Sequence, residues 1–404
     1  MPLLSTLLLM MPLIDVRSPL QAKGIDLQKT AVYAAWTDTA EPIADYQGDK
    51  LLNPASTLKL ATSYCTLKAF GPNHTFSTRY YSESKPKEGQ IQNLWIEGRG
   101  DPSLVIEELW LHVQSLKEMG IRRINGSLLI DDSYFDSKDY PGRQENNERA
   151  YNAKPTGLSL NYNSIASVSG GETVYRAADN PPVFFGQTLK QLLEESGIKM
   201  GGEIEKSKVH EGLSLLLEPK SRPLSWTVWG MNKFSNNFIA ESLVKQLGVL
   251  EMGTPGSTVN GIRKIEHCLS EIGIPKDAFF IENGSGLSYK TQFSAKNLAK
   301  VLIAVHNDPK IAPELISSLS LYGVDGTMKK RNGFKALEGS VRAKTGSLNA
   351  ISSLAGYLPV EGDRVIAFVI MMNGLKTGLW EAQKVQDKVV ETLRIWNKKS
   401  SPSS

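Results

Sequence analysis

Ser56 and Lys59 are the two residues of this sequence best suited to covalent chemistry, because they lie three positions apart on one face of a helical pattern. The pattern opens just after Pro54 and stops at Gly71-Pro72. A serine hydroxyl needs a base to take its proton, and a lysine can be that base once burial or a nearby positive charge lowers its pKa. The free N–H groups of a helix start could also hold an oxyanion. Taken alone, the pair is more typical of a capping serine beside a solvated lysine.

Two later motifs favour the catalytic interpretation. Ser235-Asn236-Asn237 lies between two helical patterns, and Lys344-Thr345-Gly346 lies at the end of a strand pattern. The chain order S-x-x-K, S-x-N, K-T-G is the signature of β-lactamases and penicillin-binding proteins. We expect glycine at position 346 because a side chain there would obstruct a peptide that docks along the strand edge.

Further segments are typical of one class of these proteins. They are NPASTLKL (53–60), GRGDPSL (98–104), LIDDSYFD (129–136), LSLNYN (158–163), NGSGLS (283–288), DGTMKKR (325–331) and VRAKTGSLNAISSLAGY (341–357). From about Val32 to Thr392 the chain resembles the class C, low-molecular-mass penicillin-binding proteins, the D-alanyl-D-alanine carboxypeptidase/endopeptidase group. The resemblance implies an α/β fold with a transpeptidase/β-lactamase-like core, whose antiparallel sheet is flanked by helices, and an inserted mixed α/β domain.

The resemblance also implies catalytic roles. Ser56 would form the acyl-enzyme on the penultimate D-Ala carbonyl while Lys59 accepts its proton. Ser235, assisted by Lys344, would relay a proton to the leaving D-Ala nitrogen, and Asn237 would hydrogen-bond the substrate backbone. Water would then hydrolyse the ester, and neither a metal nor an organic cofactor is expected.

Substrate-binding roles follow from the same resemblance. Thr345, with the charge of Lys344, would hold the terminal carboxylate, and the N–H of Ser347 would be the second oxyanion donor. Asp131 and Phe135 match positions that line the pocket for the free amino end of the stem peptide. Tyr289 departs from the pattern, because relatives that favour diaminopimelate often carry an arginine there.

The order of strand and helix patterns predicts a discontinuous catalytic domain. We expect residues 25–74 and 220–398 to form it, residues 75–219 to be inserted, and residues 399–404 to be disordered. Strands are expected over 30–37, 341–344, 350–358 and 365–373, and helices over 224–247, 258–273, 294–307 and 379–397. Between Asn163 and Asp179 we expect only a short link, hence two domains.

Residues 1–24 are expected to be a leader that directs export to the periplasm or another extracytoplasmic space, because 1–14 is an apolar run of signal-peptide length. No other stretch approaches the roughly 18 apolar residues of a membrane helix. Cys65 and Cys268 are expected to be buried free thiols, although a disulfide between them would also be possible.

Composition excludes some classes of function. The 404 residues carry 46 Lys+Arg and 42 Asp+Glu, without a basic stripe, so no nucleic-acid role is assigned. The five histidines show neither H-E-x-x-H spacing, which would indicate a zinc hydrolase, nor a G-x-S-x-G nucleophile elbow that would complete a Ser-His-Asp hydrolase.

The expected partners are peptidoglycan stem peptides and, as inhibitors, β-lactam antibiotics; no oligomeric state is assigned. Two alternatives remain, a β-lactamase or esterase and an inert wall-binding or penicillin-sensing protein.

Overall fold

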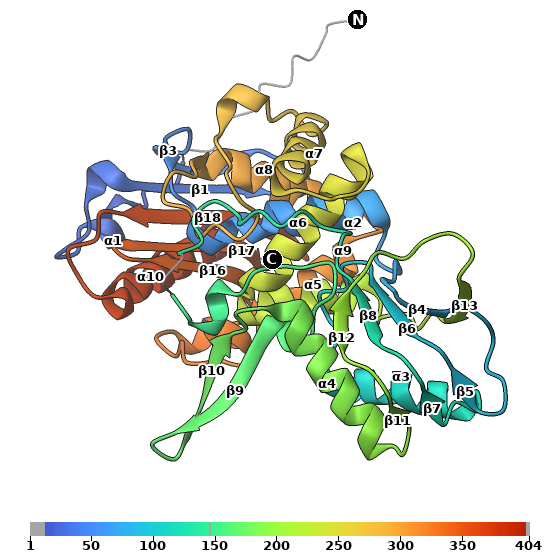
Figure 1. Cartoon of the computed structure of the whole chain (residues 1–404). Coiled ribbons are helices and arrows are strands. Elements are labelled where there is room, and N and C mark those ends of the chain that lie inside the picture. The colour runs from blue at the N-terminus through green and yellow to red at the C-terminus, as the bar shows by residue number, and fades with distance from the viewer. Residues whose placement is uncertain (1–12, 145–146, 401–404) are drawn as a thin grey trace, which may run out of the picture.

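A six-stranded antiparallel sheet joins the two ends of the chain in the computed structural model, which describes residues 13–144 and 147–400 (Figure 1). The strand order is β15-β16-β17-β18-β1-β2, so the first strand of the chain pairs directly with the last. The strands are β1 (Thr30–Trp36), β2 (Pro42–Tyr46), β15 (Ser320–Leu321), β16 (Arg342–Leu348), β17 (Ile351–Pro359) and β18 (Val365–Asn373). This antiparallel sheet with its flanking helices confirms the predicted fold class.

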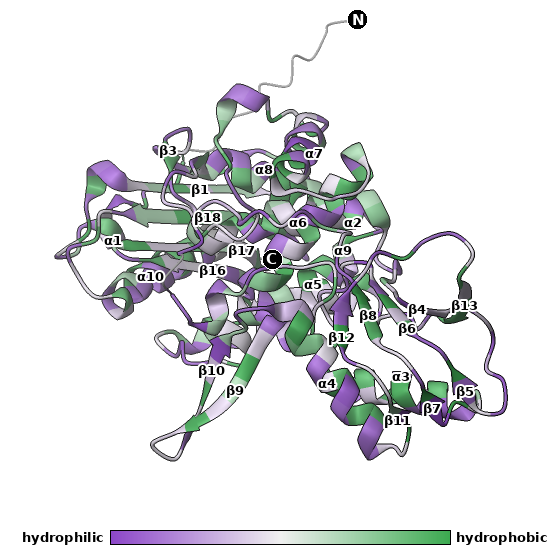
Figure 2. Cartoon of the chain, viewed as in Figure 1, coloured by the Kyte–Doolittle hydropathy of each residue, from purple (hydrophilic) through white to green (hydrophobic). Residues whose placement is uncertain are grey.

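Both faces of this sheet are buried, which explains why every residue of β1 is buried and the strand is apolar after Thr30. Ala31, Tyr33 and Ala35 pack in one core, and Val32 and Ala34 pack in the other. The first core also holds α2 (Lys59–Phe70), α5 (Leu224–Phe234), α6 (Asn237–Met252), α7 (Thr258–Ser270), α8 (Ala295–His306) and α9 (Ala312–Ser318); the second is covered by α1 (Arg17–Leu20) and α10 (Leu379–Ser400). In Figure 2 the hydrophilic colour gathers on outer helix surfaces and loops.

The remaining short elements of this main domain connect the sheet and the helices. They are η1 (Leu27–Lys29), β3 (Leu51–Leu52), η2 (Ala55–Leu58), η5 (Lys276–Ala278), β14 (Phe293–Ser294), η6 (Gly326–Met328) and η7 (Lys335–Leu337). No helix in the described part of the chain is both long and apolar enough to cross a membrane.

The ends of the main domain differ from the predicted boundaries. Residues 1–12 of the expected leader lie outside the described residues, but Ile14, Val16 and Leu20 are buried in the core beneath α10. The N–H of Ile14 donates to the carbonyl of Ile43 (2.7 Å). A cut at residue 24 would therefore remove three core side chains. At the other end α10 continues to Ser400, and 401–404 lie outside the described residues.

The chain between α2 and α5 forms a five-stranded sheet and a three-stranded sheet, whose apolar core is separate from the two cores of the main domain. Its elements are β4 (Thr78–Ser82), β5 (Gln90–Ile91), β6 (Leu94–Gly98), α3 (Ile106–Glu118), β7 (Arg123–Ile124), β8 (Leu128–Asp131), η3 (Ala150–Asn152), η4 (Asn161–Asn163), α4 (Pro181–Glu195), β11 (Lys199–Met200), β12 (Ile204–Lys206) and β13 (Ser214–Leu217). The chain returns to the main domain beside the point where it left, since the N–H of Leu224 donates to the carbonyl of His74 (2.7 Å). We call residues 75–219 the inserted domain.

The short link expected between Asn163 and Asp179 is instead a β-hairpin. Strands β9 (Ser164–Ser169) and β10 (Glu172–Ala177) pair antiparallel and project from the inserted domain (Figure 1). Gly170 and Gly171 both have positive φ, which a two-residue hairpin turn requires. The sequence prediction missed it because nearly every residue of both strands is exposed, so no alternation of buried and exposed side chains is imposed on the sequence.

Cys65 and Cys268 form a disulfide, so the expectation of free thiols is wrong. Cys65 lies in α2 and Cys268 in α7, and the packing of these helices brings the Cα atoms to 5.8 Å. This separation lies inside the range that a disulfide spans. The disulfide links the helix that follows Ser56 to a helix far along the chain, since the two cysteines are 203 residues apart.

Loss of this bridge is expected to lower the free energy of unfolding by about 4 kcal/mol, because the cross-link restricts a long loop of the unfolded chain. Urea unfolding of Cys65→Ala/Cys268→Ala against the wild type measures it. Reductant should lower the wild-type midpoint and leave the double variant unchanged. Equal response of both proteins to reductant would contradict the expectation.

Candidate active site

Ser56 lies in a tight turn that precedes α2. The expected helix start is the 3-10 helix η2, which runs directly into α2. Ala55 has a φ of 47°, and its N–H donates to the Asn53 side chain (2.8 Å). Asn53 in turn exchanges hydrogen bonds with Asn373 of β18 (2.8 and 3.0 Å). The turn that carries the serine is therefore held rigidly against the central sheet.

Lys59 is fully buried and points its amine at Ser56. Its Nζ donates to Ser56 Oγ (3.0 Å), Asn237 Oδ1 (2.8 Å) and the carbonyl of Ser285 (2.6 Å). Burial lowers the pKa of Lys59 to about 7, although the charge of Glu241 acts in the opposite direction. Near neutral pH a large share of Lys59 is thus an uncharged amine within hydrogen-bond distance of the serine, as a general base must be.

Ser235 closes α5 in a left-handed conformation, with φ 57°. Asn236 caps the next helix by accepting the N–H of Ile239 (3.1 Å), so that Asn237 begins α6 beside Lys59. Nζ of Lys344 donates to Ser235 Oγ (2.9 Å). The predicted position between two helices is therefore correct.

Lys344 is the second buried amine of the site. Burial, and then the charge of Lys59, holds the pKa of Lys344 well below its ordinary value. The site thus holds two serine–lysine pairs, Ser56–Lys59 and Ser235–Lys344. Together they offer a hydroxyl nucleophile, a base and a path for its proton.

Strand β16 forms the open wall of the site. Lys344-Thr345-Gly346 lies inside this strand rather than at its end, because β16 runs on to Leu348. In the described structure β15 pairs only with Arg342 and Ala343. The edge from Lys344 to Leu348, which includes Ser347, is left without a neighbouring strand and can accept an extended peptide.

The packing around Gly346 requires glycine at this position even without a bound peptide. A Cβ there would lie 2.2 Å from Ser353 Oγ, 2.8 Å from the carbonyl of Pro54 and 3.0 Å from the N–H nitrogen of Ser56. The sequence-based reason, free passage for a docking peptide, was therefore incomplete: β16 also packs directly on the turn that carries the nucleophile.

Glu241 is a site residue that the motifs did not reveal. Its fully buried carboxylate accepts the N–H of Ser285 (2.7 Å) and of Gly284 (3.3 Å), and so fixes the loop whose Ser285 carbonyl binds Lys59. Burial raises the pKa of Glu241. Its position one helical turn after Asn237 in α6 is the one signal that could have indicated it.

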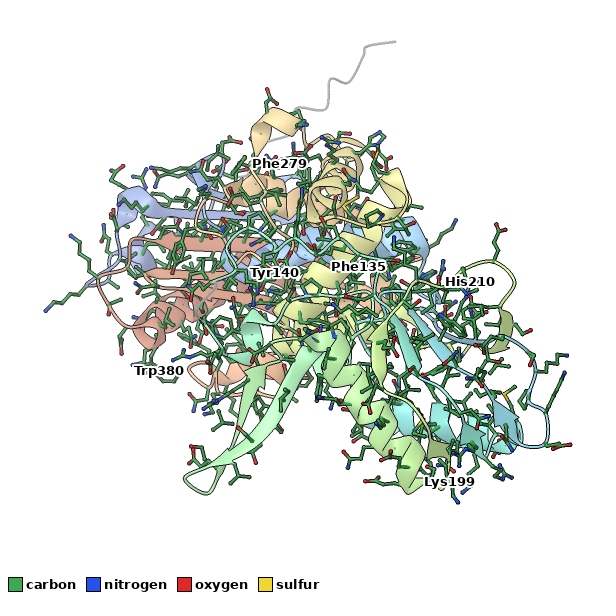
Figure 3. The ribbon with its side chains drawn as sticks, in the orientation of Figure 1. Phe135, Tyr140, Lys199, His210, Phe279 and Trp380 are labelled. Atoms are coloured by element: carbon green, nitrogen blue, oxygen red, sulfur yellow. A yellow bond between two sulfur atoms is a disulfide. The ribbon has the colours of Figure 1, made fainter. Side chains whose placement is uncertain are left out.

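Asp131 and Phe135 do not join the serine–lysine cluster. The Asp131 carboxylate accepts from the N–H and hydroxyl of Ser133 (3.0 and 2.7 Å) and from the N–H of Val209 (2.7 Å). Phe135, labelled in Figure 3, is buried at the junction of the two domains. The Lys245 amine lies 5.9 Å from the centre of its ring. Their assignment to a pocket for the stem amine stays a prediction.

Tyr289 stands at the far end of β16, where its hydroxyl accepts the N–H of Asn349 (3.2 Å) and 58% of the residue is exposed. Across 13–144 and 147–400, no group of three or more His, Cys, Asp or Glu side chains could hold a metal ion.

Comparison with known proteins decides the family. The sequence profile of the D-Ala-D-Ala carboxypeptidase 3 (S13) family matches residues 14–169 and 163–395. The chain belongs to this family. It is 27% identical to a D-alanyl-D-alanine carboxypeptidase of Actinomadura sp. (strain R39), over 89% of this chain and 80% of that protein. It is 26% identical to the D-alanyl-D-alanine carboxypeptidase DacB of Haemophilus influenzae, over 86% of each chain.

The fold agrees with this family. The crystal structure of penicillin binding protein 4 (dacB) from Haemophilus influenzae superposes with a TM-score of 0.82 at 25% identity, over 96% of this chain and 99% of that one. The predicted resemblance and enzyme class, a serine-type D-alanyl-D-alanine carboxypeptidase of the S13 family, are thereby confirmed.

The pKa of Lys59 predicts a pH profile. The second-order rate constant for acylation by penicillin should rise about tenfold per pH unit below the pKa and level off above about 7, because only the uncharged amine accepts the Ser56 proton. Stopped-flow acylation over a pH series measures it. A rise that continues toward 10.5, the ordinary lysine value, would contradict the assignment.

Proposed function

We propose that this protein hydrolyses the terminal D-Ala-D-Ala bond of peptidoglycan stem peptides through an acyl-enzyme on Ser56. The observation that carries the proposal is the 3.0 Å contact between Ser56 Oγ and the buried amine of Lys59. Lys59 takes the hydroxyl proton as Oγ bonds to the penultimate D-Ala carbonyl carbon. Water later cleaves the ester and restores the serine.

The second pair serves the leaving group. Ser235, hydrogen-bonded to Lys344, passes a proton to the departing D-Ala nitrogen as its bond to carbon breaks. Asn237 aligns the substrate backbone, and Thr345 with Lys344 holds the terminal carboxylate. The N–H groups of Ser56 and Ser347 stabilise the oxyanion, since β16 and η2 are in direct contact at Gly346.

The same acyl-enzyme extends the proposal to cross-links and to antibiotics. Cleavage of the D-Ala bond to a cross-linking amine passes through an identical ester. A structure of the Haemophilus influenzae protein is complexed with a β-lactam. We propose that β-lactams acylate Ser56 in the same way, and that the protein acts outside the cytoplasm. The disulfide supports this location because such bridges persist in oxidising compartments.

Release of free D-Ala from a stem pentapeptide tests the proposal. The wild type should release one D-Ala per peptide, and Ser56→Ala should release none above background. Thr57→Ser, a neighbouring hydroxyl change, is the matched control and should retain activity. Penicillin acylation without D-Ala release would favour a penicillin-sensing protein, and rapid turnover of penicillin would favour a β-lactamase.

A further inference from the structure

A groove of about 870 Å³ opens beside the active site, between the start of α6 and the inserted domain. Its walls come from the 234–238 segment, from η3, η4 and the start of α3, and from the β9–β10 hairpin. The volume lies in the range of pockets that enclose a small ligand or a short peptide. The mechanism proposed above does not use this space.

Four exposed aromatic side chains line this groove. Tyr151, Tyr162, Tyr175 and Phe234 are 41%, 38%, 59% and 65% exposed. Glu107 is the one ionisable acidic or basic residue in the lining described. A gathering of large exposed rings marks a binding surface more often than an inert one, because rings bury much area at little entropic cost. These rings can pack against the backbone and the apolar groups of a bound peptide.

The groove is continuous with the catalytic residues. Ser235 and Asn237, which bind Lys344 and Lys59, are part of its wall. Asn237 also donates to the carbonyl of Tyr151 (3.2 Å), so a groove residue is anchored directly on a catalytic-site amide. The groove therefore opens directly beside Ser235, the proposed proton donor to the leaving nitrogen.

We propose that the groove binds the second stem peptide of a cross-linked substrate, on the leaving-group side. The inference rests on the proposed function. A carboxypeptidase releases a single D-Ala, which needs no such space, whereas an endopeptidase releases an amine that carries a whole peptide. Ser56 Oγ first bonds to the carbonyl carbon of the cross-link to give the tetrahedral oxyanion. The C–N bond then breaks as Ser235 supplies the proton to the amine, and the freed peptide lies across Tyr151, Tyr162 and Tyr175.

Tyr175→Ser is the test, because this side chain is exposed, lies on the hairpin in the groove wall and, among the described residues, makes no hydrogen bond with Lys59 or Lys344 that the substitution could disturb. The kcat/KM of this variant is measured on a cross-linked stem-peptide dimer without sugars and on the monomeric pentapeptide. We expect about a tenfold loss on the dimer, the size of a typical interface aromatic, and less than a twofold change on the pentapeptide and in penicillin acylation. Tyr175→Trp should keep dimer cleavage.

Val168→Ser is the matched control, since it is 78% exposed on the same hairpin but outside the groove wall. It should leave both substrates unchanged. Any one of four results would overturn the inference. Dimer cleavage by Tyr175→Ser could be unchanged, or this variant could lose equal activity on both substrates. Val168→Ser could lose as much activity as Tyr175→Ser, or the loss could be seen only when the dimer carries its sugars. Failure of the wild type to release D-Ala from the pentapeptide would instead refute the proposed function.

Discussion

Lys59→Met is expected to lower the second-order rate constant of acylation by penicillin about 10⁴-fold, the upper range for loss of a general base. Methionine fills a similar length in this fully buried position but cannot accept the Ser56 proton. The carbonyl of Ser285 and the amide of Asn237 also lose their partner. Unfolding in urea should therefore show a loss of only about 1–2 kcal/mol.

Lys68→Met is the control for this experiment. Lys68 lies in the same helix, but it is partly exposed and pairs with Asp308 at the surface. Its acylation rate should stay within twofold of the wild type, because a surface ion pair contributes little. If Lys59→Met acylates nearly as fast as Lys68→Met, another group must be the base.

Gly346→Ala is expected to lower acylation by about 10²-fold or more, the cost of losing one oxyanion donor. The new methyl group would lie 2.8 Å from the Pro54 carbonyl and 3.0 Å from the Ser56 nitrogen, both backbone atoms that cannot turn aside. Strand β16 and turn η2 must therefore separate, which widens the gap between the N–H groups of Ser56 and Ser347. The acylation rate of a labelled penicillin measures the effect.

Gly230→Ala is the matched glycine control. The nearest atom to an added Cβ there is Ile239 Cδ1 at 3.7 Å, an ordinary contact, and the residue lies inside α5. Alanine should be neutral or stabilising by up to about 1 kcal/mol at such a helical position. Equal acylation by the two alanine variants would show that the packing of β16 on η2 does not shape the site.

The sequence could place those site residues whose motifs occur in the expected order along the chain and within a recognisable helix or strand pattern. Ser56, Ser235 and Lys344 could be placed because each motif occupies the helix start, helix junction or strand that it requires. The apolar runs that form β1, β17 and β18 were also visible, because burial on both faces makes such strands continuous.

Features that depend on distant packing could not be predicted. The contact between α2 and α7 decides that Cys65 and Cys268 are bonded, and sequence spacing says nothing about it. Glu241 resembles any acidic residue on a helix until the 284–285 loop is seen to fold over it. The β9–β10 hairpin was missed for the opposite reason, because it buries so little that no periodic pattern is imposed.

The most direct test of the central claim is to locate the acyl group. The wild-type protein is incubated with penicillin, digested and mapped by tandem mass spectrometry, with Ser56→Ala and Ser235→Ala treated in parallel. We predict a single adduct on Ser56, none in Ser56→Ala, and a slower adduct at the same residue in Ser235→Ala. An adduct on any other residue, or a modified Ser56→Ala protein, would contradict the assignment of Ser56 as the nucleophile.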